Sequence, residues 1–202
     1  MGKFKAKKSA LKSEKILFGA MPEFLKRGYS DTSMDRIAAS SGVSKQTLYS
    51  HFKDKETLFS SLVKHMATQR FQTIFGIKYM QGEPEQVLRN LANTLLSEIM
   101  SEPPEYQAFM RLIISESGRF PHLPQVFIRN LALPAHQALS NYFAVHTELN
   151  ISDTEAVARI FIGTLINFMI TQEILNGKEI MPMSAERLID TLVYLILCSR
   201  NN

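Results

Sequence analysis

The sequence predicts an all-α protein with a small three-helix N-terminal domain, residues 1–55, and a larger helical domain, residues 56–202. Apolar residues recur at three- and four-residue spacing along most of the chain, and no segment alternates as a strand does. Gly and Pro interrupt these patterns at short intervals, as they do between helices. A chain of 202 residues is long enough for one small and one larger domain.

The first predicted helix covers about residues 9–27. Its apolar residues fall mostly on one face, and they are Leu11, Ile16, Leu17, Ala20, Met21, Phe24 and Leu25. We expect Pro22 to kink or break this helix, and Gly28 suits a C-terminal cap with positive φ. Thr32 and Ser33 begin a capping-box pattern for a second short helix, residues 34–41.

Residues 42–59 read GVSKQTLYSHFKDKETLF and follow that short helix directly. Gly42 supplies a tight turn, Val43 fills the angle between two helices, and Ser44 caps the second helix. Leu48 and Phe52 form the inner face of this second helix. Helix, Gly-containing turn and helix make a helix-turn-helix unit, which places its second helix in the major groove of DNA.

The next helix is predicted to begin after Asp54, which caps it, and to run to about Tyr79. Beyond it, Gly82 and Pro84 mark a break before a helix over residues 87–99, and residues 103–104 (Pro-Pro) mark another. Further helices follow over residues 106–118 and from residue 121, with Pro134 breaking or kinking the latter. The last two helices, about residues 152–175 and 184–199, are the most apolar.

Residues 11–59 resemble the DNA-binding domain of the TetR family of bacterial transcriptional regulators. The matching residues are Ile16, Leu17, Ala20, Phe24, Gly28, Tyr29, Thr32, Ser33, Ile37, Ala38, Gly42, Val43, Ser44, Thr47, Leu48, Tyr49, His51, Phe52, Lys55, Glu56, Leu58 and Phe59. The resemblance implies a homodimeric, usually repressing regulator whose larger helical domain dimerises and binds a ligand. The segment RLIISESGRFP, residues 111–121, resembles a segment of family members related to multidrug-efflux repressors.

Nine residues are candidate DNA contacts: Thr32, Ser33, Ser44, Lys45, Gln46, Thr47, Tyr49, His51 and Lys55. Gln46 is the best base reader, because an amide can bond adenine with two hydrogen bonds. Tyr49 and His51 match phosphate-contacting positions of the family, and Lys55 stands where free N–H groups of a helix can join it at a phosphate. For Thr32 and Ser33, a capping role alone and a cap that also touches phosphate both stay open.

Charge divides the chain between a basic N-terminal part and a near-neutral remainder. Residues 1–60 carry a net charge of +6 and the rest carry −2, which suits a DNA-binding head on a non-binding body. The lysines at positions 3–8 fit a solvated tail equally well. One cysteine, no signal-peptide pattern, and a most apolar charge-free stretch of only thirteen residues, 160–172, indicate a cytoplasmic protein without a membrane span. The family resemblance implies a bacterial, nucleoid-associated one.

The last two helices are the predicted dimer interface. A helix that is apolar nearly all round must be buried on more than one side, either in a monomer core or in a four-helix contact between subunits. Few other helices are available to cover both faces, which favours the four-helix contact between subunits. The predicted interface residues are Val157, Ile160, Phe161, Thr164, Leu165, Leu188, Leu192, Leu195 and Ile196.

An aromatic and methionine set in the body is a candidate lining for a small, largely apolar ligand, because methionine adapts to irregular shapes. The set is Phe71, Phe75, Met100, Tyr106, Phe109, Met110, Ile113, Phe127, Phe143, Phe168 and Met169. Such a set at helical spacing is more often plain core than a ligand site.

The five scattered histidines have no metal-binding spacing, and the sequence contains no phosphate-cradling glycine loop. We therefore expect no enzyme activity, cofactor or metal. Two alternatives to a ligand-released repressor stay open. One is a DNA-binding regulator controlled by a protein partner, or a nucleoid or division factor without an inducer. The other is an enzyme with a DNA-binding-like head.

Overall fold

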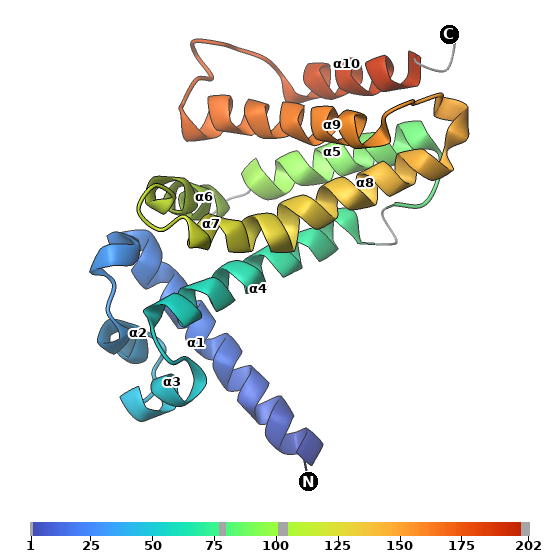
Figure 1. The fold of residues 1–202 in the computed structure, drawn as a ribbon. Coiled ribbons are helices and arrows are strands. Elements are labelled where there is room, and N and C mark those ends of the chain that lie inside the picture. The colour runs from blue at the N-terminus through green and yellow to red at the C-terminus, as the bar shows by residue number, and fades with distance from the viewer. Residues whose placement is uncertain (1, 77–79, 101–104, 199–202) are drawn as a thin grey trace. The chain divides into compact units, whose positions relative to one another are not determined.

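The computed structural model describes residues 2–76, 80–100 and 105–198, and Figure 1 shows their helices. Contacts divide the chain into two units, residues 1–66 with 108–127 and residues 67–107 with 128–202. The predicted boundary between residues 55 and 56 differs from this division. The reason is packing: Leu58, Phe59 and Leu62 share a buried cluster with Phe109 and with the helices of the N-terminal unit.

The first unit, here called the head, begins with α1 (Gly2–Asp31). This helix is longer than predicted at both ends, and it contains Pro22 without ending there. Met21 and Phe24 beside the proline are buried, so core packing offsets the hydrogen bond that proline cannot donate. Gly28 interrupts the helical angles with φ of 77°, the left-handed region that glycine tolerates best.

Three further helices complete the helix-turn-helix region: α2 (Met34–Ser40), α3 (Lys45–His51) and the start of α4 (Lys55–Phe75). The caps predicted from sequence are present. Ser33 accepts a hydrogen bond from the N–H of Arg36, Ser44 from that of Thr47, and Asp54 from that of Thr57. The backbone hydrogen bond to Asp54 also lowers the pKa of its carboxyl. Three short polar side chains thus fix where the helices begin.

The core of the head closes around Phe24, Phe59 and Phe109, all fully buried. Phe24 and Phe59 meet edge to face with ring centroids 4.8 Å apart. The later part of α6 (Glu105–Glu116) and α7 (His122–Phe127) belong to this unit, since Leu112, Ile113 and Leu123 are buried in the same cluster.

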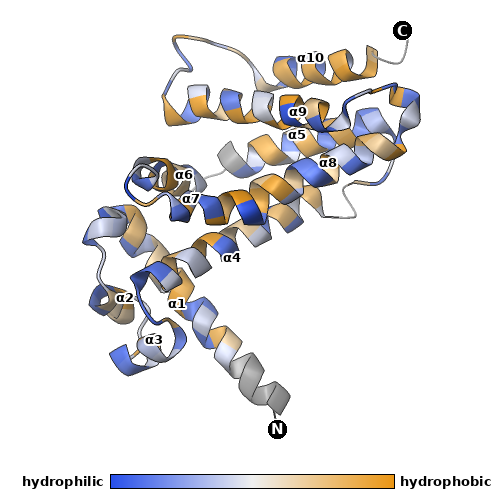
Figure 2. Cartoon of the chain, viewed as in Figure 1, coloured by the Kyte–Doolittle hydropathy of each residue, from blue (hydrophilic) through white to orange (hydrophobic). Residues whose placement is uncertain are grey.

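The second unit, here called the body, contains α5 (Pro84–Met100), α8 (Leu133–Val145), α9 (Thr154–Met169) and α10 (Ala185–Leu197). α8 packs on α9, and α5 packs on both α9 and α10. Figure 2 shows α10 as mostly hydrophobic, in agreement with its sequence. A π-helical turn, Ile128–Ala132, precedes α8, and it accommodates Pro134 at the second position of that helix.

α9 continues through a second π-helical turn, Ile170–Ile174. The combined helix Thr154–Ile174 has 21 residues and a mean hydropathy of 1.3 over its most apolar window, which meets the length and composition expected of a membrane span. The same values fit a core helix, and α9 packs against α8 and α5 with Phe161, Leu165 and Met169 fully buried. The body core thus accounts for one apolar face of this helix. A short 3-10 turn, Thr147–Leu149, links α8 to this segment.

α4 ends at Phe75, before the predicted end near Tyr79, and the next residue, Gly76, is no longer helical. Two parts of the predictions fall outside the described residues. These are the Pro-Pro break at residues 103–104 and the side chain of Met100.

Candidate nucleic-acid interface

The first turn of α3 is presented to solvent on a rigid frame. Gly42 adopts φ of 59°, which lets the chain reverse between α2 and α3, and Val43 packs partly buried against the head core. Leu48 is fully buried and Phe52 is nearly so, which fixes the inner face of α3. Ser44 accepts a hydrogen bond from the N–H of Thr47 at 3.1 Å. Together these contacts fix both the start and the rotation of α3.

The outer face of α3 carries donors and acceptors suited to DNA. Lys45, Gln46 and Tyr49 are exposed, and 51% of the Tyr49 surface is accessible. The Nζ of Lys45 lies 2.7 Å from Oδ2 of Asp35 on α2. Both partners of this ion pair are well exposed, so it is worth at most about 1 kcal/mol and can exchange for a phosphate. The arrangement offers an amide, an ammonium and a phenol on one accessible surface.

Ser33 and Ser44 are the N-caps of α2 and α3, and Thr47 lies in the first turn of α3. Ser33 and Ser44 are exposed, and the hydroxyls of Ser44 and Thr47 lie 2.9 Å apart. Thr32 differs from expectation, because it is only 2% exposed. Its hydroxyl donates within the head to the carbonyl oxygens of Gly28 at 2.8 Å and Glu23 at 3.1 Å. Ser33 rather than Thr32 is therefore the cap of α2, and the Thr32 hydroxyl ties the end of α1.

The ammonium of Lys55, a predicted phosphate contact, has hydrogen-bond partners within the head. Its Nζ donates to the carbonyl oxygens of Tyr29 at 2.7 Å and Ser30 at 2.8 Å, and it lies 4.7 Å from the centre of the Tyr29 ring. Partial burial lowers the pKa of this ammonium. The side chain is thus directed inward, where it holds the α1–α2 turn against α4.

His51 lies at the C-terminal end of α3 and contacts α1. Its Nδ1 lies 2.8 Å from the hydroxyl of Ser13, and the ring is half-buried. This contact leaves Nε2 as the ring atom for an outside partner. Sequence reasoning did not find Ser13, because the two residues are 38 positions apart and neither belongs to a periodic pattern.

A second group missed from the sequence joins the end of α6 to the α1–α2 turn. The Oε1 atom of Glu116 accepts a hydrogen bond from the backbone N–H of Tyr29 at 3.0 Å. The Nη1 atom of Arg119 donates to the hydroxyl of Ser30 at 2.9 Å. Phe120 packs edge to face on Tyr29 with centroids 4.7 Å apart. Burial, with smaller effects from nearby carboxylates, raises the pKa of Tyr29. Residues 116–120 therefore help to build the head itself.

The predicted ligand-lining set divides between the two units. Phe109 and Ile113 are buried in the head core, and Phe127 packs against it, so these residues have a structural role there. Met110 lies in the same part of α6 and is half-buried. In the body, the buried members are Phe75, Tyr106, Phe143, Phe168 and Met169, while Phe71 is half-buried and stacks on Phe75. Burial raises the pKa of Tyr106 to about 12.

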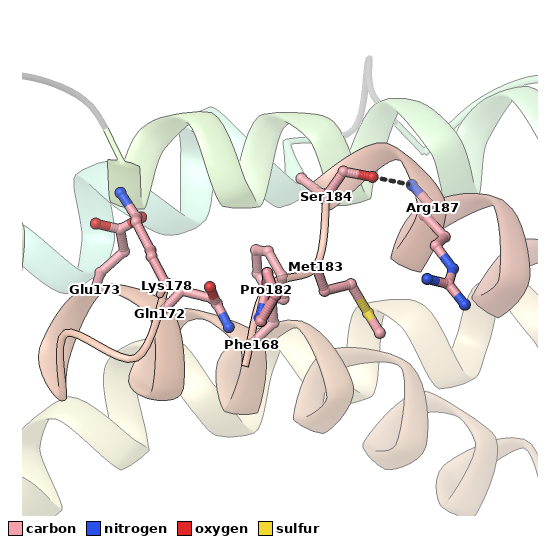
Figure 3. Close-up of a pocket in the computed structure, with 9 residues that line it drawn as sticks. Phe168, Gln172, Glu173, Lys178, Pro182, Met183, Ser184 and Arg187 are labelled. Atoms are coloured by element: carbon pink, nitrogen blue, oxygen red, sulfur yellow. Dashed lines mark hydrogen bonds and ion pairs between the residues drawn. The ribbon is translucent and has the colours of Figure 1, made fainter. Parts of the chain in front are cut away.

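Phe168 also lines a cavity of about 470 Å³ beneath the segment that joins α9 to α10 (Figure 3). The other lining residues are Gln172, Glu173, Lys178, Pro182, Met183, Ser184, Ala185 and Arg187. A neighbouring hollow shares Phe168 and Met183 and adds Thr164 of α9 and Leu188 of α10. The body therefore has a site that combines apolar walls with a lysine, an arginine and a glutamate.

The predicted dimer residues differ in how exposed they are on the protomer. Phe161 and Leu165 are fully buried within the protomer, and Leu192 and Ile196 are 6% exposed, so these four belong to the body core and are not available to a second subunit. Ile160 is 60% exposed and Leu195 is 62% exposed, and both remain candidates. The half-buried members are Val157, Thr164 and Leu188. Tyr194, which the prediction omitted, is 65% exposed beside Leu195.

Comparison with known families connects this geometry to a protein class. A family described as "Bacterial regulatory proteins, tetR family" matches residues 16–62, and "AefR-like transcriptional repressor, C-terminal domain" matches residues 86–199. The chain belongs to the TetR family. Members of this family are transcriptional regulators rather than enzymes.

Individual TetR relatives agree with this assignment. The uncharacterised regulator YuxN of Bacillus subtilis is 26% identical over 77% of the chain, and the match spans 55% of YuxN. A crystal structure of a TetR-family regulator from Mesorhizobium loti is 29% identical with a TM-score of 0.78, covering 94% of this chain and 96% of that one. The flavonoid-responsive regulator FrrA is 26% identical with a TM-score of 0.73, covering 94% and 97%.

Proposed function

We propose that the protein is a cytoplasmic TetR-type repressor that binds a near-palindromic operator on the nucleoid as a homodimer. In this proposal, a small, largely apolar ligand releases it. The observation that carries the DNA-binding part is the exposed first turn of α3, capped by Ser44 and fixed on its inner face by buried Leu48. A rigid, outward-facing short helix of this kind enters the major groove in helix-turn-helix proteins.

The side chains of this surface divide into readers and anchors. Gln46 is the proposed base reader, because its exposed amide can donate and accept at one adenine edge. Lys45, Thr47, Tyr49 and the capping residue Ser33 are proposed phosphate contacts, which set the register on the duplex. Ser44 contributes by capping α3, which fixes where the helix begins. His51 is a proposed DNA contact through its Nε2, because its Nδ1 is bonded to Ser13.

A two-fold arrangement would let two heads read successive major grooves. Helix-turn-helix dimers bind half-sites about 34–36 Å apart, or multiples of that spacing. The proposed subunit contact consists of the exposed apolar residues of α9 and α10, namely Ile160, Tyr194 and Leu195, with the half-buried Thr164 and Leu188. Large exposed apolar side chains that gather into a patch are typical of interaction sites.

Ligand release is supported by the cavity at the α9–α10 segment and by the name of one similar protein. FrrA is described as flavonoid-responsive, and flavonoids are small and largely apolar. The cavity offers Phe168 and Met183 as apolar contacts and Lys178 and Arg187 as charged ones. A ligand changes DNA binding only by its different affinity for the bound and released conformations. α4 and α6 contribute residues to both units, so in this proposal they transmit the conformational change from the ligand site in the body to the head.

Selection of bound fragments from genomic DNA, followed by footprinting of the recovered sites, tests the proposal. The expected result is a protected, near-palindromic site whose occupancy falls in the presence of an active ligand. Candidate ligands are found by thermal shift and then tested for DNA release. Recovery of no preferred sequence at any salt concentration would refute operator binding. A preferred site that no ligand releases would refute only the ligand part.

A further inference from the structure

α1 extends well beyond the part of it that packs in the head. The helix begins at Gly2, whereas from residue 9 onward, where burial is described, the first fully buried residue is Ile16. At a rise of about 1.5 Å per residue, the preceding turns are roughly 20 Å long. Figure 1 shows these N-terminal turns extending past α2 and α3 within the head. The core of the head therefore does not account for this length of helix.

The extension is strongly basic. Residues 2–13 contain five lysines and no acidic residue. Four lysines of α1, at positions 5, 8, 12 and 15, are spaced by three, four and three residues, which places these positions on one face of a helix. Lys12 and Lys15 are exposed. A single-sign stripe of this kind repels itself unless an anionic partner neutralises it.

Contacts farther along α1 fix the end of this face at Lys15. Gly19 shares the face by register and abuts Ser41 at the end of α2, where an added Cβ would collide with the Ser41 side chain. Next to it, the Nζ of Lys15 lies 3.6 Å from where a Cβ on Gly42 would stand. The face therefore continues directly from the turn that leads into α3. On another side of α1, Ser13 is held by His51 at the end of α3.

We propose that this lysine face, Lys5, Lys8, Lys12 and Lys15, binds the phosphate backbone of the DNA that flanks each operator half-site. The inference rests on the proposed operator binding and extends it beyond the recognition helix. It assigns a partner to the basic segment that would otherwise be a solvated tail. Since adjacent base pairs are about 3.4 Å apart, the 20 Å extension can reach at most about 6 base pairs beyond the core site.

The test compares a double variant, Lys8→Gln with Lys12→Gln, with a matched control, Lys26→Gln with Lys64→Gln. Glutamine has nearly the helix propensity of lysine, and Lys12, Lys26 and Lys64 are all exposed, so both variants should fold; circular dichroism checks this. Each pair removes two positive charges per protomer. The measurement is the affinity of the full chain for the selected operator from 50 to 200 mM salt, with and without 6 base pairs of flanking DNA on each side.

Four contacts per dimer contribute about 3.6 to the slope of log affinity against log salt. The wild type should therefore lose about 100-fold more affinity than the lysine-face variant over this salt range, and the control should behave as the wild type does. The wild type should also bind flanked DNA more tightly than the core site, and the lysine-face variant should lose this preference. Equal slopes and equal length dependence in both variants would overturn the inference.

Two further outcomes are separated by the same proteins. If the wild type binds no operator, the proposed function fails. That failure is distinct from a failure of the lysine-face inference, which appears only as equal behaviour of the two variants on an operator that the wild type binds. Leu11 and Phe18 are 58% and 59% exposed on α1, so a basic helix with apolar neighbours also suits an anionic bilayer. Co-sedimentation with vesicles of phosphatidylglycerol and phosphatidylcholine tests this. Vesicle binding that the lysine-face variant loses, together with unchanged operator binding, would assign the face to a lipid surface and overturn the DNA inference.

Discussion

Replacing Phe161 by alanine should destabilise the protein strongly, whereas replacing the adjacent Ile160 should not. Phe161 is fully buried in the body, and Ile160 is 60% exposed on the same helix. Truncating a buried phenylalanine costs about 3–5 kcal/mol from lost burial and the cavity left behind. An exposed substitution typically changes the free energy of unfolding by less than about 0.5 kcal/mol. One residue along α9 therefore separates the protomer core from the proposed subunit contact.

Thermal unfolding followed by circular dichroism measures the difference at one fixed protein concentration. For a chain of this length, Tm falls by about 2–4 °C for each kcal/mol, so Phe161→Ala should lower Tm by about 6–20 °C. Ile160→Asp supplies the complementary test, because it should weaken self-association in sedimentation equilibrium while the isolated protomer stays folded. If Phe161→Ala left Tm within 2 °C of the wild type, the assignment of Phe161 to the protomer core would be wrong.

The remaining predictions concern the head and one buried tyrosine. Gln46→Ala should weaken binding to the selected operator by about 1–3 kcal/mol and leave non-specific binding unchanged; equal losses on both DNAs would exclude base reading. Lys55→Met should leave the salt slope of DNA binding unchanged, because the ammonium is used by two carbonyl oxygens, and a slope lowered by about 1 per protomer would contradict this. Gly42→Ala should cost about 1–2 kcal/mol in denaturant unfolding, because φ of 59° strains a residue with a Cβ; an unchanged midpoint would argue against this turn geometry. The pKa of Tyr106 is raised from 10.0 to about 12 in the folded protein, so its contribution to stability is complete below pH 10 and is lost as the pH rises through 12. The check is the urea unfolding midpoint measured between pH 10 and pH 12. It should fall with pH in the wild type and fall less in Tyr106→Phe.

The starts of α2, α3 and α4 could be predicted because capping is a local property. Ser33, Ser44 and Asp54 each accept a hydrogen bond from a backbone N–H three residues ahead, and such spacing is visible in the sequence. The roles of Lys55 and Thr32 could not be found in this way. Their partners are backbone carbonyl oxygens elsewhere in the fold, which carry no sequence signal.

The two faces of α9 show a different limit of sequence reasoning. Both faces are apolar, so hydrophobic periodicity indicates burial on two sides without indicating which side faces the protomer core. The structure buries Phe161 and Leu165 against the body and leaves Ile160 outward. The choice depends on how α5 and α8 pack on α9, and that depends on long-range contacts. The prediction therefore identified the right helices and mixed residues from their two faces.

The membership of residues 108–127 in the head changes how a signal can reach the DNA-binding surface. Glu116 of α6 holds the backbone N–H of Tyr29, and Lys55 of α4 holds the carbonyl oxygens of Tyr29 and Ser30, so two helices hold the last turn of α1. That turn precedes α2, and α2 precedes the α3 surface that carries Gln46. A displacement of α6 would therefore change the support of the turn without any direct contact to DNA. Because Tyr29 is largely buried and its N–H needs a partner, such a displacement would also carry a free-energy cost of about 1–3 kcal/mol. A difference of that size between two conformations is enough to change DNA affinity about 5- to 150-fold.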